Sequence, residues 1–195
     1  MLAAAREEHF LGPGDVSLHL EHSEAFAGLV PMPPGVAVDL GSGAGIPGLV
    51  LALLWPESRW ALVDANVRRT DFVREAVAGL GLADRVEVVV ARAEVIGHEA
   101  HRRAAADLVV ARGFGPPAVV AECAAPLLRA GGALIVAEPP GGAPDRWPPE
   151  GLAALGLSRD ASTVEPVALQ RLRQIAPCPD RYPRRVGIPL KRPLW

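Results

Sequence analysis

The sequence predicts an α/β protein built on a doubly wound, mostly parallel sheet. Short apolar runs alternate with segments of helical pattern, and a glycine-rich turn joins the first run to the first helix that follows it. The runs lack the polar alternation of half-exposed strands, as expected for strands buried on both faces. With 195 residues, 50% of them hydrophobic, and a net charge of −2, the chain suits one globular unit with one core.

The order of the elements follows from the spacing of these runs. Between the strands lie segments with helical spacing and polar faces, which predicts right-handed βαβ crossovers. The predicted strands cover residues 36–40, 60–63, 86–91, 108–111 and 133–137, and the predicted helices cover residues 48–54, 67–80, 99–105 and 117–128.

The remaining segments predict three parts of the chain. Residues 1–30 are expected to form a short helical extension, and residues 31–176 the main domain, which ends in a strand pair at 157–165 and 169–176. Residues 177–195 are rich in proline and basic residues, so we expect an arm or a tail rather than a helix.

The composition indicates the compartment of the protein and argues against disulfide and metal sites. No apolar stretch reaches membrane-spanning length, and charged residues interrupt the amino terminus, so we expect a cytoplasmic protein. We also expect a monomer. Cys123 and Cys178 do not form a disulfide framework. His19 and His22 have helical spacing but no third ligand in view, so we expect no metal site.

The glycine-rich turn reads VDLGSGAGIPG over residues 38–48 and is the first candidate for a binding site. Residues 43–48 also satisfy the G-x-G-x-x-G pattern of dinucleotide sites, with Asp64 at about the 20-residue spacing that a ribose-binding carboxylate needs. Asp39, however, would lie close to a pyrophosphate. A carboxylate there suits S-adenosylmethionine (SAM), whose methionine end carries an ammonium and a sulfonium.

Two other interpretations of the turn stay open from the residues alone. The glycines could serve only to let a helix pack closely on the sheet, with Asp64 capping the helix at 67–80. NAD-type binding also remains possible, because a carboxylate at Asp64 can hold ribose hydroxyls of either ligand.

Several motifs together resemble one known family, the bacterial small-subunit ribosomal RNA guanine-N7 methyltransferases, also called glucose-inhibited division protein B. The motifs are DLGSGAGIPG at 39–48, LVDANVRRTDFV at 62–73, ARAE at 91–94, DLVVARG at 107–113 and RYPRRVGIPLKRPL at 181–194. They occur in the family's order and span most of the chain. The resemblance implies a class I SAM-dependent methyltransferase fold, of the Rossmann-like type.

The resemblance also implies the residues that contact the methyl donor. Gly41, Ile46, Ala93, Glu94 and Arg112 match family positions that do so, and Asp64 matches the acidic residue after the second strand. With the neighbours argued from the residues, the predicted donor set comprises Asp39, Gly41, Ser42, Gly43, Gly45, Ile46, Asp64, Ala65, Ala93, Glu94 and Arg112.

Each of the polar positions has a plainer alternative. Glu94 could cap the next helix from an exposed position, and Arg112 could form a surface salt bridge. The implied reaction, methylation of guanine N7, needs no general base because N7 carries a lone pair and no proton. Arg112 is therefore expected to position a group rather than to transfer a proton.

Recognition of RNA has to come from local charge, since the net charge attracts no nucleic acid. The predicted RNA contacts are Arg68, Arg69, Arg181, Arg184, Arg185 and Lys191, although the arm could equally pack against the sheet edge with its cations in solvent.

The chain departs from the family pattern at several places, and the helical segment that usually precedes the His19–Ser23 element is missing or very short. His22 stands where the family has aspartate, and Glu138 stands near an expected lysine, where a carboxylate would repel phosphate. These departures leave two alternatives open: a related methyltransferase acting on a small molecule or another RNA, and a donor-binding protein without catalysis.

Overall fold

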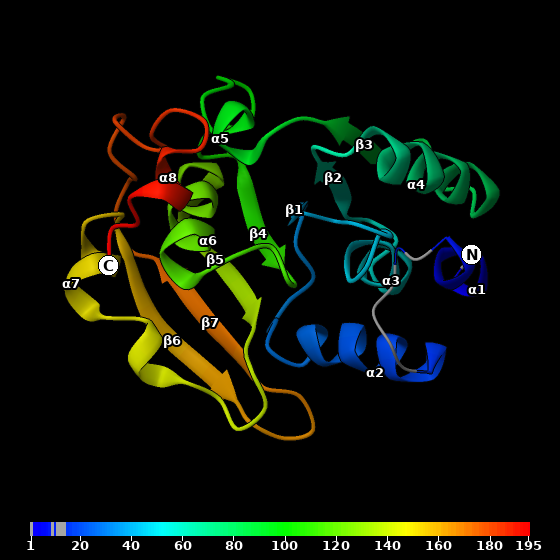
Figure 1. The fold of residues 1–195 in the computed structure, drawn as a ribbon, viewed down its shortest axis with the longest axis horizontal. Helices are drawn as coiled ribbons and strands as arrows, with labels where there is room; N and C mark the ends of the chain where they lie inside the picture. The colour runs from blue at the N-terminus through cyan, green and yellow to red at the C-terminus, as the bar shows by residue number, and fades with distance from the viewer. Residues whose placement is uncertain (1, 9, 11–14) are drawn as a thin grey trace.

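The computed structural model describes residues 2–8, 10 and 15–195, and contains a seven-stranded sheet of order β3-β2-β1-β4-β5-β7-β6 (Figure 1). The first five strands pair in parallel, while β7 lies antiparallel between β5 and β6. The strands are β1 (Val36–Leu40), β2 (Arg59–Asp64), β3 (Val86–Val90), β4 (Ala106–Ala111), β5 (Leu128–Ala137), β6 (Leu157–Thr163) and β7 (Leu169–Gln174). The predicted doubly wound, mostly parallel sheet is confirmed.

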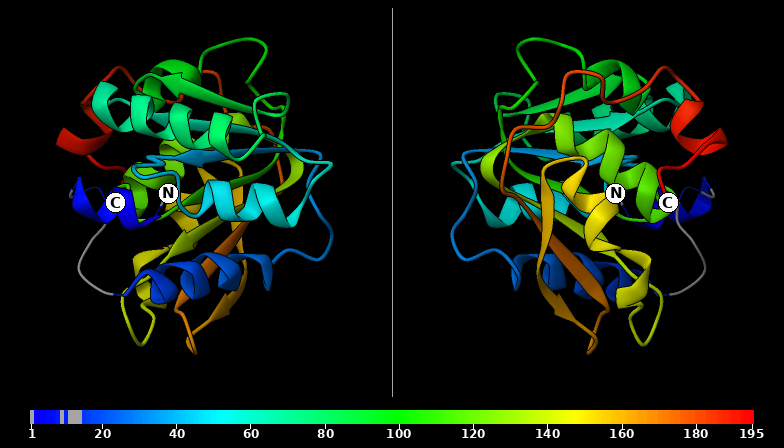
Figure 2. Two further views of the ribbon diagram at one scale, coloured as in Figure 1. Left: turned by 90° about the vertical axis from the view of Figure 1, so that its right-hand side faces the viewer. Right: turned by 90° about the vertical axis from the view of Figure 1, so that its left-hand side faces the viewer.

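Helices cover both faces of this sheet, as Figures 1 and 2 show. The α-helices are α1 (Leu2–Glu7), α2 (Val16–Ala27), α3 (Gly48–Leu54), α4 (Val67–Gly79), α5 (Ala93–Ile96), α6 (Pro117–Ala124), α7 (Pro149–Ala153) and α8 (Ile188–Lys191). Two short 3-10 helices, η1 (Ala125–Leu127) and η2 (Pro144–Arg146), complete the set found in the described residues.

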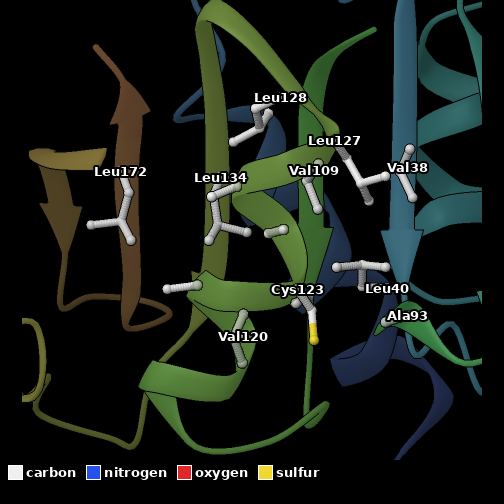
Figure 3. Close-up of a cluster of buried hydrophobic side chains, with 14 of the residues drawn as sticks. Val38, Leu40, Ala93, Val109, Val120, Cys123, Leu127, Leu128, Leu134 and Leu172 are labelled. Carbon is white, nitrogen blue, oxygen red and sulfur yellow. The ribbon is translucent and has the colours of Figure 1, made fainter. Parts of the chain in front are cut away.

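Alternate residues of the central strands enter two separate hydrophobic clusters, because successive strand side chains point to opposite faces. In β1, Val38 and Leu40 belong to the cluster that includes residues of α5, α6 and α7, whereas Ala37 belongs to the cluster that includes residues of α2, α3 and α4. Figure 3 shows the first cluster, in which side chains of α6 lie over the sheet. Burial on both faces explains why these strands are apolar throughout.

Two predicted helices differ from the observed ones. Residues 99–105 form turns, because the amides of Ala104 and Ala105 donate to the carbonyls of Pro126 and Leu127 at 2.9 and 3.0 Å instead of to their own helix. The helix of this crossover is the short α5, which starts directly after β3. The helix predicted at 117–128 ends at Ala124, and Pro126 lies in the 3-10 turn that follows.

The start of α4 is fixed by Asn66. Its side-chain oxygen accepts a hydrogen bond from the backbone amide of Arg69 at 3.2 Å, so Asn66, and not Asp64, is the N-cap of this helix.

We expect Asn66→Ala to lower the free energy of unfolding by about 1 kcal/mol, measured by urea denaturation, while Asn66→Ser retains most of the stability. Equal losses for both variants would contradict this role.

None of the helices in the described part of the chain is both long and apolar enough to cross a membrane.

Candidate functional site

The glycine turn between β1 and α3 rests on the carboxyl end of β2. The amides of Gly41 and Ser42 both donate to the carbonyl of Val63, at 2.8 and 3.0 Å. Gly43 donates to Asp64 Oδ2 at 3.0 Å. The turn therefore positions its backbone directly beside the Asp64 carboxylate.

Two glycines of the turn allow contacts that a side chain would block. Gly41 has a φ of +70°, and a Cβ there would lie 2.6 Å from Phe114. A Cβ at Gly48 would collide with Leu62 and lie 2.6 Å from Asp39 Oδ2. The glycine pattern thus serves close packing, as the plainer interpretation held, and also shapes a cavity.

A cavity of about 290 Å³ opens at the carboxyl ends of the parallel strands, the usual ligand position in such sheets. Its lining includes five residues of the predicted donor set: Gly41, Asp64, Ala65, Ala93 and Glu94. Arg69, predicted to contact RNA, also lines it. Six predicted donor residues are not among the lining residues: Asp39, Ser42, Gly43, Gly45, Ile46 and Arg112.

Asp64 is oriented from two sides. Its Oδ2 accepts from Gly43, and its Oδ1 accepts from the backbone amide of Asn66 at 2.8 Å. Arg69 lies 3.8 Å from Oδ2. Each carboxylate oxygen has a second lone pair, so this side chain can accept two further hydrogen bonds from a ligand.

Arg112 turns away from this cavity towards α2. Its Nη2 lies 2.9 Å from Nδ1 of His19, which accepts the hydrogen bond because the guanidinium can only donate. Several buried polar atoms around this point have no hydrogen-bond partner among the described residues: His22 Nε2, Asp39 Oδ1, Ser42 Oγ and Arg112 Nη1. Because buried polar atoms are normally paired, this group suits a small polar ligand fragment or water.

Asp39 is fully buried beside this group. Burial raises the pKa of its carboxyl from 3.8 to about 7, although the hydrogen bond from Gly48 and the charge of Arg112 act in the opposite direction. The pKa of His22 is lowered by burial and by the nearby Arg112 and His19, which favours its neutral form. Near neutral pH, the charge at this point therefore changes with the protonation of Asp39.

Glu94 is buried and is held by the carboxyl-terminal arm. Its Oε1 accepts from the backbone amide of Gly187 at 3.0 Å and from Arg92 Nη2 at 3.2 Å. Hydrogen bonds from Gly187 and Arg92 outweigh burial and lower the pKa of this carboxyl. Glu94 does lie in the first turn of α5, as the plainer alternative held, but its side chain is only 5% exposed, so the expected exposed position is wrong.

Sequence analysis missed several residues that line the cavity. Phe114 packs on Gly41, Cys123 comes from α6, and Leu190 comes from the arm. Burial raises the pKa of the Cys123 thiol strongly, so it is a protonated wall residue. No local motif marks these positions.

Comparison with known proteins places the chain in a family. The GidB family, described as rRNA small subunit methyltransferase G, matches residues 17–138. The chain belongs to this family. It is 34% identical to ribosomal RNA small subunit methyltransferase G of Rubrobacter xylanophilus, over all of this chain and 80% of that protein. It is also 39% identical to the protein of the same name from Roseiflexus castenholzii, over 83% of this chain and 71% of that protein.

Two solved structures that share this fold are methyltransferases. Geranyl diphosphate C-methyltransferase from Streptomyces coelicolor, solved with S-adenosyl-L-homocysteine, gives a TM-score of 0.67 at 12% identity, covering 82% of this chain and 81% of that one. A SAM-dependent O-methyltransferase from Thermotoga maritima gives 0.60 at 14% identity, covering 80% and 65%. Its family and its fold together make the chain a class I SAM-dependent methyltransferase.

The residues of this GidB-family chain fit SAM. Asp64 has free lone pairs at the cavity for ribose hydroxyls, and Ala93 with Phe114 and Cys123 offers apolar walls for an adenine. Asp39 and Arg112 lie behind the glycine turn, outside the lining of this cavity, and each keeps a buried polar atom without a hydrogen-bond partner among the described residues.

Glu138 is the acidic departure from the GidB pattern, and its carboxylate binds two neighbouring side chains. Its Oε2 accepts from Arg146 at 2.6 Å, and its Oε1 accepts from the indole of Trp147 at 2.8 Å. The side chain is 4% exposed. Because its charge is paired and buried, the expected repulsion of phosphate at this position is weak.

Arg184 also has a structural partner. Its guanidinium bonds both oxygens of Glu122, a carboxylate with no exposed surface, at 2.8 and 2.6 Å. Arg184 therefore anchors the arm, while its side chain remains 27% exposed.

The other predicted RNA contacts retain exposed surface. Arg68 pairs with Glu8 at 3.3 Å across an exposed surface, and Arg181 lies over the ring of Tyr182. Arg185 and Lys191 are exposed on the arm.

Among the described residues, no group of three or more histidine, cysteine, aspartate or glutamate side chains is placed to hold a metal ion.

Proposed function

We propose that this protein transfers the methyl group of SAM to N7 of a guanine in small-subunit ribosomal RNA. The observation that carries the proposal is the match along the whole chain to a ribosomal RNA small subunit methyltransferase G. The family and fold establish the methyl donor, and the relatives' name supports the class of acceptor.

The chemistry of N7 fits the side chains around the cavity. Guanine N7 attacks a methyl group with its in-plane lone pair and loses no proton, so the protein needs to hold the base and the donor in line. SAM supplies the activated methyl group on its sulfonium. Arg69 and Arg92 at the cavity, and Arg112 behind the turn, are donors that can orient anionic or carbonyl groups.

The position of the arm supports an RNA acceptor. Because Leu190 lines the cavity, the neighbouring Lys191 lies close to its mouth, and Arg185 is exposed on the same segment. These cations suit phosphates around a target base, which must lie outside a regular helix since the A-form major groove is too narrow for side chains.

Label transfer tests the function directly. Methyl-labelled SAM is incubated with unmodified small ribosomal subunits, with naked ribosomal RNA and with a blank that contains only protein, and the RNA is digested for nucleoside analysis. We expect N7-methylguanosine in an RNA sample. Absence of transfer to either sample, with demonstrable donor binding, would contradict the proposal.

A charge variant tests the RNA-binding face. We expect Arg185→Ala with Lys191→Ala to raise KM for RNA about tenfold and to make it less dependent on salt, because two phosphate contacts are lost. The affinity for S-adenosylhomocysteine should stay unchanged. Arg74→Ala, on the exposed side of α4, is the matched control; an equal effect in both variants would contradict the assignment.

A further inference from the structure

The carboxyl-terminal arm is built into the wall of the donor cavity. We define the arm contact segment as residues 178–191, which run past α5 and α6 and end in α8 beside α6 (Figures 1 and 2). Leu190 of this segment lines the cavity, together with Val119 and Cys123 of α6.

The first anchor of the segment is Arg103. Its Nη1 donates to the carbonyl of Tyr182 at 2.9 Å, and its Nη2 donates to the carbonyls of Cys178 and Pro179 at 3.0 and 3.1 Å. His98 Nε2 lies 2.7 Å from the carbonyl of Pro183. Side chains of the β3–β4 connection therefore fix the irregular backbone of residues 178–183.

The second anchor is the pair of Glu122 and Arg184. Besides the two guanidinium contacts, Glu122 Oε1 accepts from the backbone amide of Arg184 at 2.8 Å. Glu122 lies on α6, next to the wall residue Cys123. A fully buried carboxylate needs its charge partner, so this contact holds the arm at one position on α6.

The third anchor reaches the cavity itself. The amide of Gly187 donates to Glu94, a wall residue, and Leu190 follows within the next turn of chain. The arm therefore connects the Glu122–Arg184 pair to the wall residues Glu94 and Leu190.

We propose that the arm contact segment is an element of the donor site, in which the Glu122–Arg184 pair is a positioning pair that sets affinity for SAM through Gly187, Glu94 and Leu190. The proposal concerns donor binding without RNA, so it is tested independently of the proposed acceptor.

Calorimetric titration with S-adenosylhomocysteine tests the positioning pair. Glu122→Gln keeps the size of the side chain but removes the charge, and Arg184 can turn towards solvent because it is already partly exposed. We expect the Kd to rise about tenfold, with kcat at saturating SAM retained and KM for SAM raised in parallel. A folded variant with unchanged Kd would overturn the proposal.

A second variant avoids the risk to folding. Leu190→Ala removes a side chain that is 60% exposed, and we expect the Kd to rise about threefold. Leu53→Ala, from a leucine that is 50% exposed on α3, is the matched control and should leave the Kd unchanged. Equal Kd values for both variants would contradict a role for the arm.

Hydrogen exchange gives a readout that a merely structural role would not change. We expect S-adenosylhomocysteine to slow amide exchange in residues 184–191 of the wild-type protein, and to do so less in Glu122→Gln at the same fractional saturation. Protection confined to the glycine turn and β2, with none in the arm, would overturn the proposal.

Discussion

Asp64→Asn is expected to weaken binding of SAM by about 100-fold. The carboxylate lines the cavity, and in the proposed site its free lone pairs accept two ribose hydroxyls. Hydrogen bonds to a charged acceptor contribute about 1.5–3 kcal/mol each, and the asparagine amide would present a donor to one of the hydroxyls. Loss of about 3 kcal/mol corresponds to the stated change in Kd.

Calorimetric titration with S-adenosylhomocysteine measures this effect. Asp71→Asn, on the exposed side of α4, is the control for loss of one negative charge and should bind normally. Circular dichroism must show that Asp64→Asn is folded, because the carboxylate also accepts from Gly43 and Asn66. A folded variant with a Kd within threefold of wild type would remove Asp64 from the ribose site.

Protonation of Asp39 is expected to make the stability of the protein without donor depend on pH. Burial raises the pKa of this carboxyl from 3.8 to about 7, so between these pH values the folded protein keeps a proton that the unfolded chain releases. This contribution to the free energy of unfolding is fully present below pH 4. It is lost as the pH rises to 7, by up to about 4 kcal/mol.

Urea denaturation at pH 5 and pH 8 tests this expectation. The difference in unfolding free energy between wild type and Asp39→Asn should change between the two pH values in favour of the variant at pH 8. Parallel pH curves for both proteins would contradict the assignment.

The sequence predicted the central sheet well because its signals are local. The apolar run at 36–40 and the glycine turn after it correspond to β1 and the start of α3. The helix predicted at 99–105 was wrong because the amides of Ala104 and Ala105 bond to the carbonyls of Pro126 and Leu127, a pairing that helical periodicity cannot reveal.

The candidate site was predictable only in part for the same reason. Asp64 and Ala93 follow strands, so their position at the carboxyl edge follows from topology. The contact between Gly187 and Glu94 spans 93 residues, as does that between Arg112 and His19, and neither leaves a pattern along the chain. Long-range contacts of this kind explain why the sequence did not predict the arm as a cavity wall.

Residues that lie far apart in the sequence line the same cavity, so they are synthesised at different times. Gly41 and Leu190 line the same space, although most of the chain lies between them. During synthesis, β1 and β2 leave the ribosome long before the arm does, so an emerging chain can pair these strands but cannot enclose the donor. Completion of the cavity is therefore coupled to synthesis of residue 190, and a chain arrested before that point would have the sheet without its full wall.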